Sequence, residues 1–387
     1  MNPWGPLASR FGTERPRRLL ALDGGGIRGV LTLEILAEIE KQLRELTGGS
    51  ESFRLSDFFD YIGGTSTGAI MAAGLARGMS VTELLEFYVE VGPQMFDKER
   101  LLRRYRNLYK SEPLEAQLKK TFGEGTNLFP EHLRCLLLVV TRNHSTDSPW
   151  PISSNPLAKY NDSSRPDCNL KIPLWQIVRA STAAPIFFPP EVVEWEEGNP
   201  EKSFVFVDGG VTPYNNPAFL LYRMATLAPY RLGWKTGEKN LMLVSVGTGA
   251  APATDADVLS PSKNALSNLA GLPSALMYGA SVDQDINCRS VGRCVYGAPI
   301  DREIGDLIPR DAQDSRIPLS EDLGRDFLYA RYNADLSAAG LAQLGLQGVD
   351  PARVQSLDSI DAIDDLRKVG RQVAREVWMR DFEPFLR

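Results

Sequence analysis

This sequence has no excess of positive charge and no long apolar run, and each absence excludes a class of protein. Lysine and arginine number 43 against 49 aspartates and glutamates, which gives a net charge of −6. No long basic run offsets this balance, so binding to DNA or RNA is not expected. No apolar run reaches the roughly 18 residues of a membrane-spanning helix, and residues 1–18 lack the apolar core of a signal peptide.

Cysteine is also scarce, and its spacing argues against a metal centre. The four cysteines are Cys135, Cys168, Cys288 and Cys294. None of them forms the closely spaced pairs that bind metal ions. Cys135 opens an apolar, strand-like run, so a buried free thiol is its predicted state. Free thiols are typical of a reducing compartment, and we therefore expect a cytoplasmic protein without a metal site.

The chain contains one stretch in which a serine is placed as in known nucleophiles. The pattern Gly-Thr-Ser-Thr-Gly at residues 64–68 follows an aromatic, β-prone run and precedes small, helix-prone residues. A strand, a sharp G-x-S-x-G turn and a helix together expose a serine hydroxyl as a nucleophile. The helix N-terminus also directs its amides toward charge that develops near Ser66 Oγ. Ser66 is therefore the predicted nucleophile, and the alternative is a turn that contains a serine by chance.

A glycine-rich loop lies near the start of the chain. Residues 23–29, Asp-Gly-Gly-Gly-Ile-Arg-Gly, follow a short buried-type strand and precede a segment of helical periodicity. Consecutive amides at a helix start bind anions, so the loop could cradle a phosphate. From Gly24 it matches the dinucleotide pattern G-x-G-x-x-G only loosely, and no convincing ribose-binding acid follows. The same amides could form an oxyanion hole, or the glycines could serve the backbone alone.

A serine needs a base to take its proton, and the usual base is histidine. The chain has only His132 and His144, and neither lies late in the sequence, where the order Ser…Asp…His would place it. His144 follows a predicted strand and stays open as a base. Asp208 is the other candidate, at the end of the strand 204–207 and before two glycines. Its ordinary pKa of about 3.9 makes it a weak base, and its alternative role is an Asx turn.

Strand-like and helix-like segments alternate between residues 17 and 250. This alternation predicts a mostly parallel sheet that is covered by helices on both faces. Ligand sites in such sheets lie at the carboxyl ends of the strands. The residues expected at such ends are Asp23, Ser66, Asp208 and Gly247.

We divide the chain into a tail or arm at residues 1–16, a core at 17–250 and a helical extension at 251–387. The extension has apolar residues at helical spacing over 359–382, and we expect it to pack on the same domain. In the core, residues 100–109 combine basic and aromatic side chains. Such a stretch could contact an anionic lipid surface, form part of a lid, or be an ordinary solvated helix face.

Three motifs in this order resemble those of the patatin-like phospholipases. They are the loop at 23–29, the serine turn at 64–68 and Asp-Gly-Gly at 208–210, and Ala-Ser-Thr-Ala-Ala-Pro at 180–185 adds to them. The resemblance covers roughly residues 17–250. It implies a three-layer α/β/α sandwich and catalysis by a serine and an aspartate without histidine or a metal.

The resemblance also implies a role for individual residues of the chain. Ser66 would be the nucleophile and Asp208 the base, and the scarcity of histidine would then be expected. The oxyanion hole would consist of the amides of Gly24, Gly25 and Gly26, with Arg28 supporting their loop. The substrate implied is a membrane phospholipid, cleaved at its acyl esters by an enzyme that contacts the inner face of the membrane.

A second resemblance concerns regulation. Residues 150–160 and 331–336 look similar to bacterial cytoplasmic members of the family, some of which are anti-phage effectors activated by a cyclic nucleotide. It implies a cyclic dinucleotide activator, and a constitutive lipid hydrolase is the alternative. Two other classes stay open: a non-catalytic module that binds a nucleotide or lipid, and a dinucleotide oxidoreductase. The oligomeric state, a homo-oligomer included, is also open.

Overall fold

Nine strands form one sheet in the computed structural model, which describes residues 2–96, 112–185, 188–196, 198–250 and 265–386. In chain order the strands are β1 Arg17–Leu22, β2 Tyr61–Thr65, β3 Leu136–Asn143, β4 Ser148–Ser153, β5 Glu191–Glu194, β6 Ser203–Asp208, β7 Leu241–Val246, β8 Arg293–Tyr296 and β9 Leu328–Tyr332.

Helices fill most of the segments between these strands. They are α1 Ala8–Phe11, α2 Gly29–Leu46, α3 Leu55–Phe58, α4 Thr67–Arg77, α5 Val81–Phe96, α7 Glu112–Phe122, α8 Leu174–Ser181, α9 Ala218–Thr226, α10 Ala265–Val291, α11 Ala338–Gln343, α12 Pro351–Gln355 and α13 Ile363–Ala374.

The sheet is parallel at its centre and antiparallel at one side. Its order is β5-β6-β3-β2-β1-β7-β9-β8, and β4 pairs with β3 off this path. The pairs from β3 through β2, β1, β7 and β9 to β8 are all parallel. The pairs that β4, β5 and β6 make are antiparallel. The predicted mostly parallel sheet is therefore confirmed.

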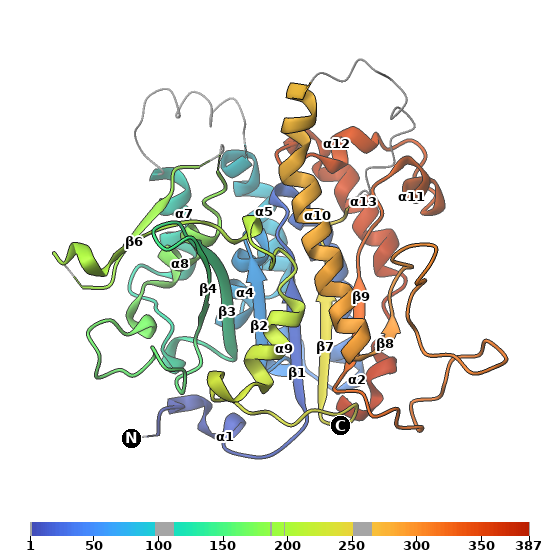
Figure 1. The fold of residues 1–387 in the computed structure, drawn as a ribbon, viewed down its shortest axis with the longest axis horizontal. Coiled ribbons are helices and arrows are strands. Elements are labelled where there is room, and N and C mark those ends of the chain that lie inside the picture. Colours follow the sequence, from blue (N-terminus) through green and yellow to red (C-terminus); the bar gives the residue numbers. More distant parts are fainter. Residues whose placement is uncertain (1, 97–111, 186–187, 197, 251–264, 387) are drawn as a thin grey trace.

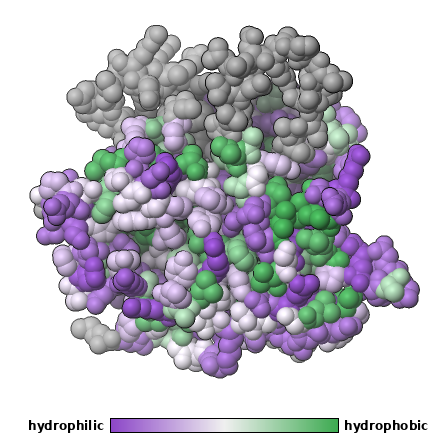
Figure 2. All heavy atoms as spheres, in the orientation of Figure 1, coloured by the Kyte–Doolittle hydropathy of each residue, from purple (hydrophilic) through white to green (hydrophobic). Residues whose placement is uncertain are grey.

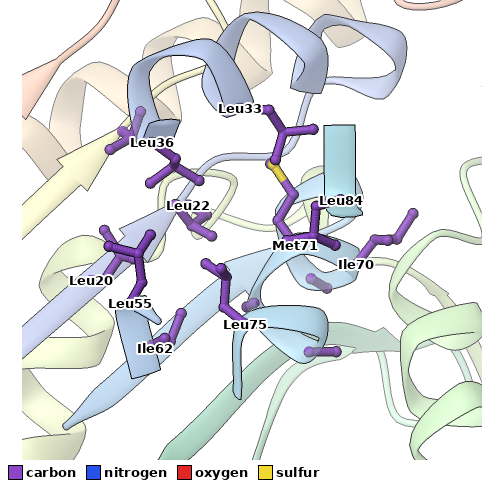
Figure 3. Packing of buried hydrophobic residues seen from close by; sticks show 14 of the residues in the cluster. Leu20, Leu22, Leu33, Leu36, Leu55, Ile62, Ile70, Met71, Leu75 and Leu84 are labelled. Carbon is purple, nitrogen blue, oxygen red and sulfur yellow. The ribbon is translucent and has the colours of Figure 1, made fainter. Parts of the chain in front are cut away.

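Helices cover both faces of this sheet, because the central strands are apolar on both sides. Leu20 and Leu22 of β1 enter one core with α2, α4 and α8, whereas Leu19 and Ala21 enter the other with α9. Figure 1 shows α9 and α10 in front of the strands. Figure 3 shows the other face, where Leu20, Leu22 and Ile62 of the strands pack near side chains of α2 and α4. The three-layer α/β/α sandwich is confirmed.

β3 aligns two strands whose ends meet. β2 pairs in parallel with residues 136–140 of β3, and β6 pairs antiparallel with residues 141–143. β4 pairs with residues of both segments and must take the opposite edge. β2 and β6 therefore lie one after the other along one edge of β3, with their carboxyl ends together. Thr65 pairs with Val140, and Asp208 pairs with the next residue, Thr141.

The chain beyond residue 264 contributes strands as well as helices. β9 pairs with β7, and β8 with β9, so both extend the parallel sheet. α10 contacts α9, and α13 lies along α2. A Cβ atom on Gly370 of α13 would lie 2.6 Å from the carbonyl oxygen of Leu31 in α2, so these two helices are in close contact. The division of the chain into domains stays a prediction.

The residues before β1 pack on the rest of the molecule. Arg10 Nε donates to Asp60 Oδ1 at 3.0 Å, and the Phe11 ring stacks on Trp234 with centroids 6.1 Å apart. The basic and aromatic stretch at 100–109 lies outside the described residues. Of the helices that are described, none combines the length and apolar character needed to cross a membrane.

Candidate active site

Ser66 occupies the sharp turn between β2 and α4. Its backbone adopts φ 54° and ψ −122°, a conformation that costs a residue other than glycine about 1–3 kcal/mol. The Ser66 amide donates to Ser181 Oγ at 2.9 Å, and Ser181 in turn donates to the Val140 carbonyl at 2.7 Å. The surrounding chain therefore holds the strained turn in place.

The glycines on either side of Ser66 are needed because backbone passes close to both. A Cβ atom on Gly64 would lie 2.1 Å from the carbonyl oxygen of Gly68. A Cβ atom on Gly68 would lie 2.3 Å from the carbonyl oxygen of Leu22. The G-x-S-x-G pattern at this position thus has a steric cause.

Asp208 lies within hydrogen-bond distance of the serine. Ser66 Oγ donates to Asp208 Oδ2 at 2.6 Å, and the amide of Gly210 donates to Oδ1 at 2.6 Å. The Asp208 amide is fixed by the carbonyl of Ala183 at 2.9 Å. Burial raises the pKa of Asp208 to about 6, and the two hydrogen bonds and the charge of Arg179 only partly oppose this. A carboxylate of higher pKa is a stronger base.

The glycine-rich loop runs directly past Ser66. A Cβ atom on Gly24 would lie 3.3 Å from Ser66 Cβ. The Gly24 amide already donates to the Asn215 carbonyl at 3.0 Å, whereas those of Gly25 and Gly26 donate to no group in the part of the chain that the structure describes. Gly26 has φ +59°, which glycine adopts readily. Gly25 and Gly26 of this loop therefore keep amides that no described residue accepts.

Arg28 contacts the backbone of this loop through its guanidinium group. Its Nε donates to the Gly25 carbonyl and its Nη1 to the Gln355 carbonyl, each at 3.4 Å. Burial lowers the pKa of Arg28 to about 10, and the nearby charge of Asp23 opposes the shift. Arg28 therefore stays charged at neutral pH.

Asp23 forms a buried ion pair with Arg331 of β9. Arg331 Nη1 donates to Asp23 Oδ1 at 2.8 Å and to Ser245 Oγ at 2.7 Å. Burial raises the pKa of Asp23, and the charge of Arg331 opposes this. Gly247, the other expected strand-end residue, accepts a hydrogen bond from Thr32 at its carbonyl. Sequence reasoning missed the ion pair; an arginine inside an apolar strand was its only signal.

Neither histidine takes the place of Asp208 beside the serine. His132 Nδ1 bonds Asn127 at 2.8 Å. His144 is exposed, and its amide donates to the Val205 carbonyl at 2.7 Å. Ser181 and Ala183, which hold Ser66 and Asp208, both belong to the stretch 180–185. Sequence reasoning singled that stretch out without finding this function.

A cavity of about 170 Å³ adjoins the glycine-rich loop, with charged and polar groups in its walls. Asp23, Arg28 and Arg331 line it together with Met277, Tyr278 and Ser281 of α10. Within the described ranges no three histidine, cysteine, aspartate or glutamate side chains gather as metal ligands.

The fold and the site define a class of protein: an α/β/α sandwich with a strained serine beside a buried carboxylate. Comparison with known proteins is more specific. The family model for patatin-like phospholipases matches residues 20–222, more than half of the chain. The chain belongs to the patatin-like phospholipase family.

Two curated relatives illustrate the range of the family. A cGAMP-activated phospholipase of Vibrio cholerae is 33% identical over 52% of this chain and 56% of its own length. Patatin-like protein 4 of Arabidopsis thaliana is 32% identical over 60% of this chain and 59% of its own. The chain thus spans less than two thirds of either relative.

Among solved structures, human GIVD cytosolic phospholipase A2 in complex with a fluorophosphonate inhibitor and terbium chloride aligns over 99% of this chain and 62% of its own. The TM-score is 0.38 and the identity 12%.

Proposed function

We propose that this protein is a lipid acyl hydrolase that cleaves the fatty acyl esters of membrane phospholipids. The observation that carries the proposal is the 2.6 Å hydrogen bond from Ser66 Oγ to Asp208, a carboxylate whose pKa is raised to about 6. Membership of the patatin-like phospholipase family supports the same reaction.

In the proposed mechanism Ser66 Oγ attacks the ester carbonyl carbon while Asp208 takes the hydroxyl proton. The free amides of Gly25 and Gly26 then donate to the oxyanion of the tetrahedral intermediate. The Gly24 amide does not donate to the oxyanion in this mechanism, because it already donates to the Asn215 carbonyl. The lack of a side chain at Gly24 leaves room beside Ser66. Arg28 keeps the loop in position through the Gly25 carbonyl.

Asp208 returns the proton to the departing glycerol-side oxygen, which leaves an acyl ester on Ser66. Asp208 then takes a proton from water, the water attacks the acyl carbonyl, and the fatty acid leaves as Ser66 regains its hydrogen. No metal or cofactor enters these steps.

As part of the same proposal, the enzyme acts in the cytoplasm, at the inner face of the membrane. Exposed apolar side chains near the site support contact with lipid: Val211, three residues after Asp208, and Leu276 of α10 are 46% and 72% exposed. Figure 2 shows polar and apolar residues interspersed over the face that carries α10. A cyclic dinucleotide activator is part of the proposal, supported by the cGAMP-activated relative.

The test is fatty-acid release from phospholipid vesicles by the wild type, Ser66→Ala, Asp208→Asn and His144→Ala, with and without cyclic dinucleotides. We expect the first two variants to lose activity by at least about 10³-fold, and His144→Ala to match the wild type. Activity that survives in Asp208→Asn would contradict the aspartate base. Wild-type protein that neither releases fatty acid nor labels at Ser66 with a fluorophosphonate would leave a non-catalytic lipid- or nucleotide-binding module as the better reading.

A further inference from the structure

A second, larger cavity lies away from the serine, beside β4. Its volume is about 520 Å³, within the range of small-molecule sites, and neither Ser66 nor Asp208 lines it. Its walls come from β4, from the loop that follows it, from residues around β6 and from the short helix Ala228–Tyr230. Nothing in the proposed hydrolysis uses this cavity.

Aromatic rings make up much of the cavity wall. They belong to Trp150, Tyr160, Trp195, Phe204 and Tyr230. The Trp150 and Trp195 rings meet edge to face at 5.5 Å, and the Trp150 and Phe204 rings lie 5.0 Å apart. Flat aromatic walls of this kind are suited to the ring of a heteroaromatic base, which stacks on them.

One polar group in the wall is buried and has no hydrogen-bond partner among the described residues. Asn161 lines the cavity and is 3% exposed. Its amide nitrogen donates to the carbonyls of Ser153 and Asn155 at 2.7 and 2.6 Å, but its Oδ1 accepts no hydrogen bond from the described residues. An unpaired buried acceptor costs about 1–3 kcal/mol. A base with a ring N–H or an amino group could satisfy it, whereas an acyl chain could not.

The charges at the cavity favour an anion. Lys159 and Lys202 line it, together with a single carboxylate, Asp167. Asp167 lies 3.4 Å from Lys202 Nζ and also accepts from Arg165 at 2.8 Å, so cations outnumber it. This local excess is unlike the chain as a whole, whose net charge is −6. Lysine ammonium groups commonly bind phosphate.

We infer that this cavity is a nucleotide-binding site. The base stacks on the tryptophans and donates a hydrogen bond to Asn161 Oδ1, and the phosphate lies near Lys159 and Lys202. Binding of a nucleotide here does not depend on the proposed function. Activation of the hydrolase by that nucleotide does rest on the proposed function.

β6 joins the cavity to the serine site. Phe204 lines the cavity, and Asp208 ends the same strand four residues later. A second connection runs through β3, because Thr141 pairs with Asp208 and donates through Oγ1 to the Trp150 carbonyl at 3.0 Å. A ligand that moves Trp150 therefore acts on the backbone that positions the carboxylate.

The experiment measures binding to the full chain by tryptophan fluorescence and calorimetry. The protein is Ser66→Ala, which cannot turn over lipid, and the probes are cyclic GMP–AMP, GMP, AMP and, separately, oleate. We expect saturable binding of at least one nucleotide. Adding Lys159→Ala and Lys202→Ala should weaken it about tenfold or more, and adding Trp195→Ala about fivefold or more, given 1–3 kcal/mol for each stacked base.

The matched control is Lys235→Ala with Lys239→Ala, which removes the same charge from two exposed lysines outside the cavity. It should keep the affinity of the parent, and thermal melting checks that each variant is folded. The inference is overturned if no nucleotide binds at millimolar concentration, if both lysine pairs weaken binding equally, or if oleate alone occupies the site. The assay contains no ester substrate, so its failure leaves the Ser66–Asp208 proposal intact, and an inactive wild type leaves the nucleotide site intact.

Discussion

At the scale of single residues, the environment of Asp208 predicts how activity depends on pH. The carboxylate must be ionised to take the proton of Ser66, and burial raises its pKa to about 6. The rate of Ser66 labelling by a fluorophosphonate should therefore rise about tenfold per pH unit up to pH 6 and level off above it. Rates measured between pH 4.5 and 8 check this. A rate that is already level at pH 4.5 would contradict it.

The same shift has a consequence for stability. Burial raises the folded-state pKa of Asp208 from 3.8 to about 6, so the folded protein holds a proton that the unfolded chain has lost. Stability from this group is present below about pH 4 and is lost as the pH rises toward 6. The free energy of unfolding of Asp208→Asn should therefore increase relative to that of the wild type between pH 4 and 6, by about 3 kcal/mol at most. Urea denaturation at pH 4, 5, 6 and 7 measures the gain, which should be constant above pH 6.

Some features of the candidate site were predictable from the sequence and others were not. The serine and the aspartate are each marked by glycines that the backbone requires, since a Cβ on Gly64 or Gly68 beside Ser66, or on Gly209 beside Asp208, would clash. The hydrogen bond that the Gly24 amide donates to the Asn215 carbonyl has no such mark, because it depends on the path of a loop far away in the sequence. Sequence alone therefore could not separate Gly24 from Gly25 and Gly26, whose amides have no partner among the described residues.

At the scale of elements, one ion pair fastens the end of β1 to β9. Arg331 and Asp23 are both about 5% exposed. Arg331→Met would leave the Asp23 carboxylate buried without a partner, which should cost about 3–5 kcal/mol of unfolding free energy. Asp23→Asn together with Arg331→Met should recover part of that loss.

Urea denaturation measures both effects. Arg371→Met is the control, because Arg371 is 55% exposed and its pair with Glu34 should be worth at most about 1 kcal/mol. The prediction would be wrong if Arg331→Met lowered the free energy of unfolding no more than Arg371→Met does.

The apolar pattern of the sequence could not predict whether a strand runs parallel or antiparallel to its neighbours. The run 204–207 reads as a strand, but only the structure shows that β6 enters antiparallel and meets β2 end to end. β8 and β9 span four and five residues, and the sequence around them has no alternation to mark them. Apart from β6, the strands that the apolar runs predicted lie in the parallel part of the sheet, where both faces are buried.

At the scale of the whole molecule, the segments after residue 264 cover surfaces that the core cannot leave open. β9 takes the outer edge of β7, and α13 packs along α2. A chain that ends at residue 250 would expose a parallel edge strand and an apolar helix face. We expect it to aggregate or unfold when expressed alone. A soluble 1–250 fragment with a cooperative melting transition would instead support an independent core.

Because β2 and β6 meet end to end along β3, the spacing along β3 determines how far apart Ser66 and Asp208 lie. Ser66 and Asp208 lie 142 positions apart in the chain, yet the gap between them is set by two consecutive β3 residues, Val140 and Thr141. One residue inserted there would lengthen the gap by about 3.3 Å, more than a hydrogen bond tolerates. β3 contributes neither Ser66 nor Asp208, yet a change in its length would break the hydrogen bond between them.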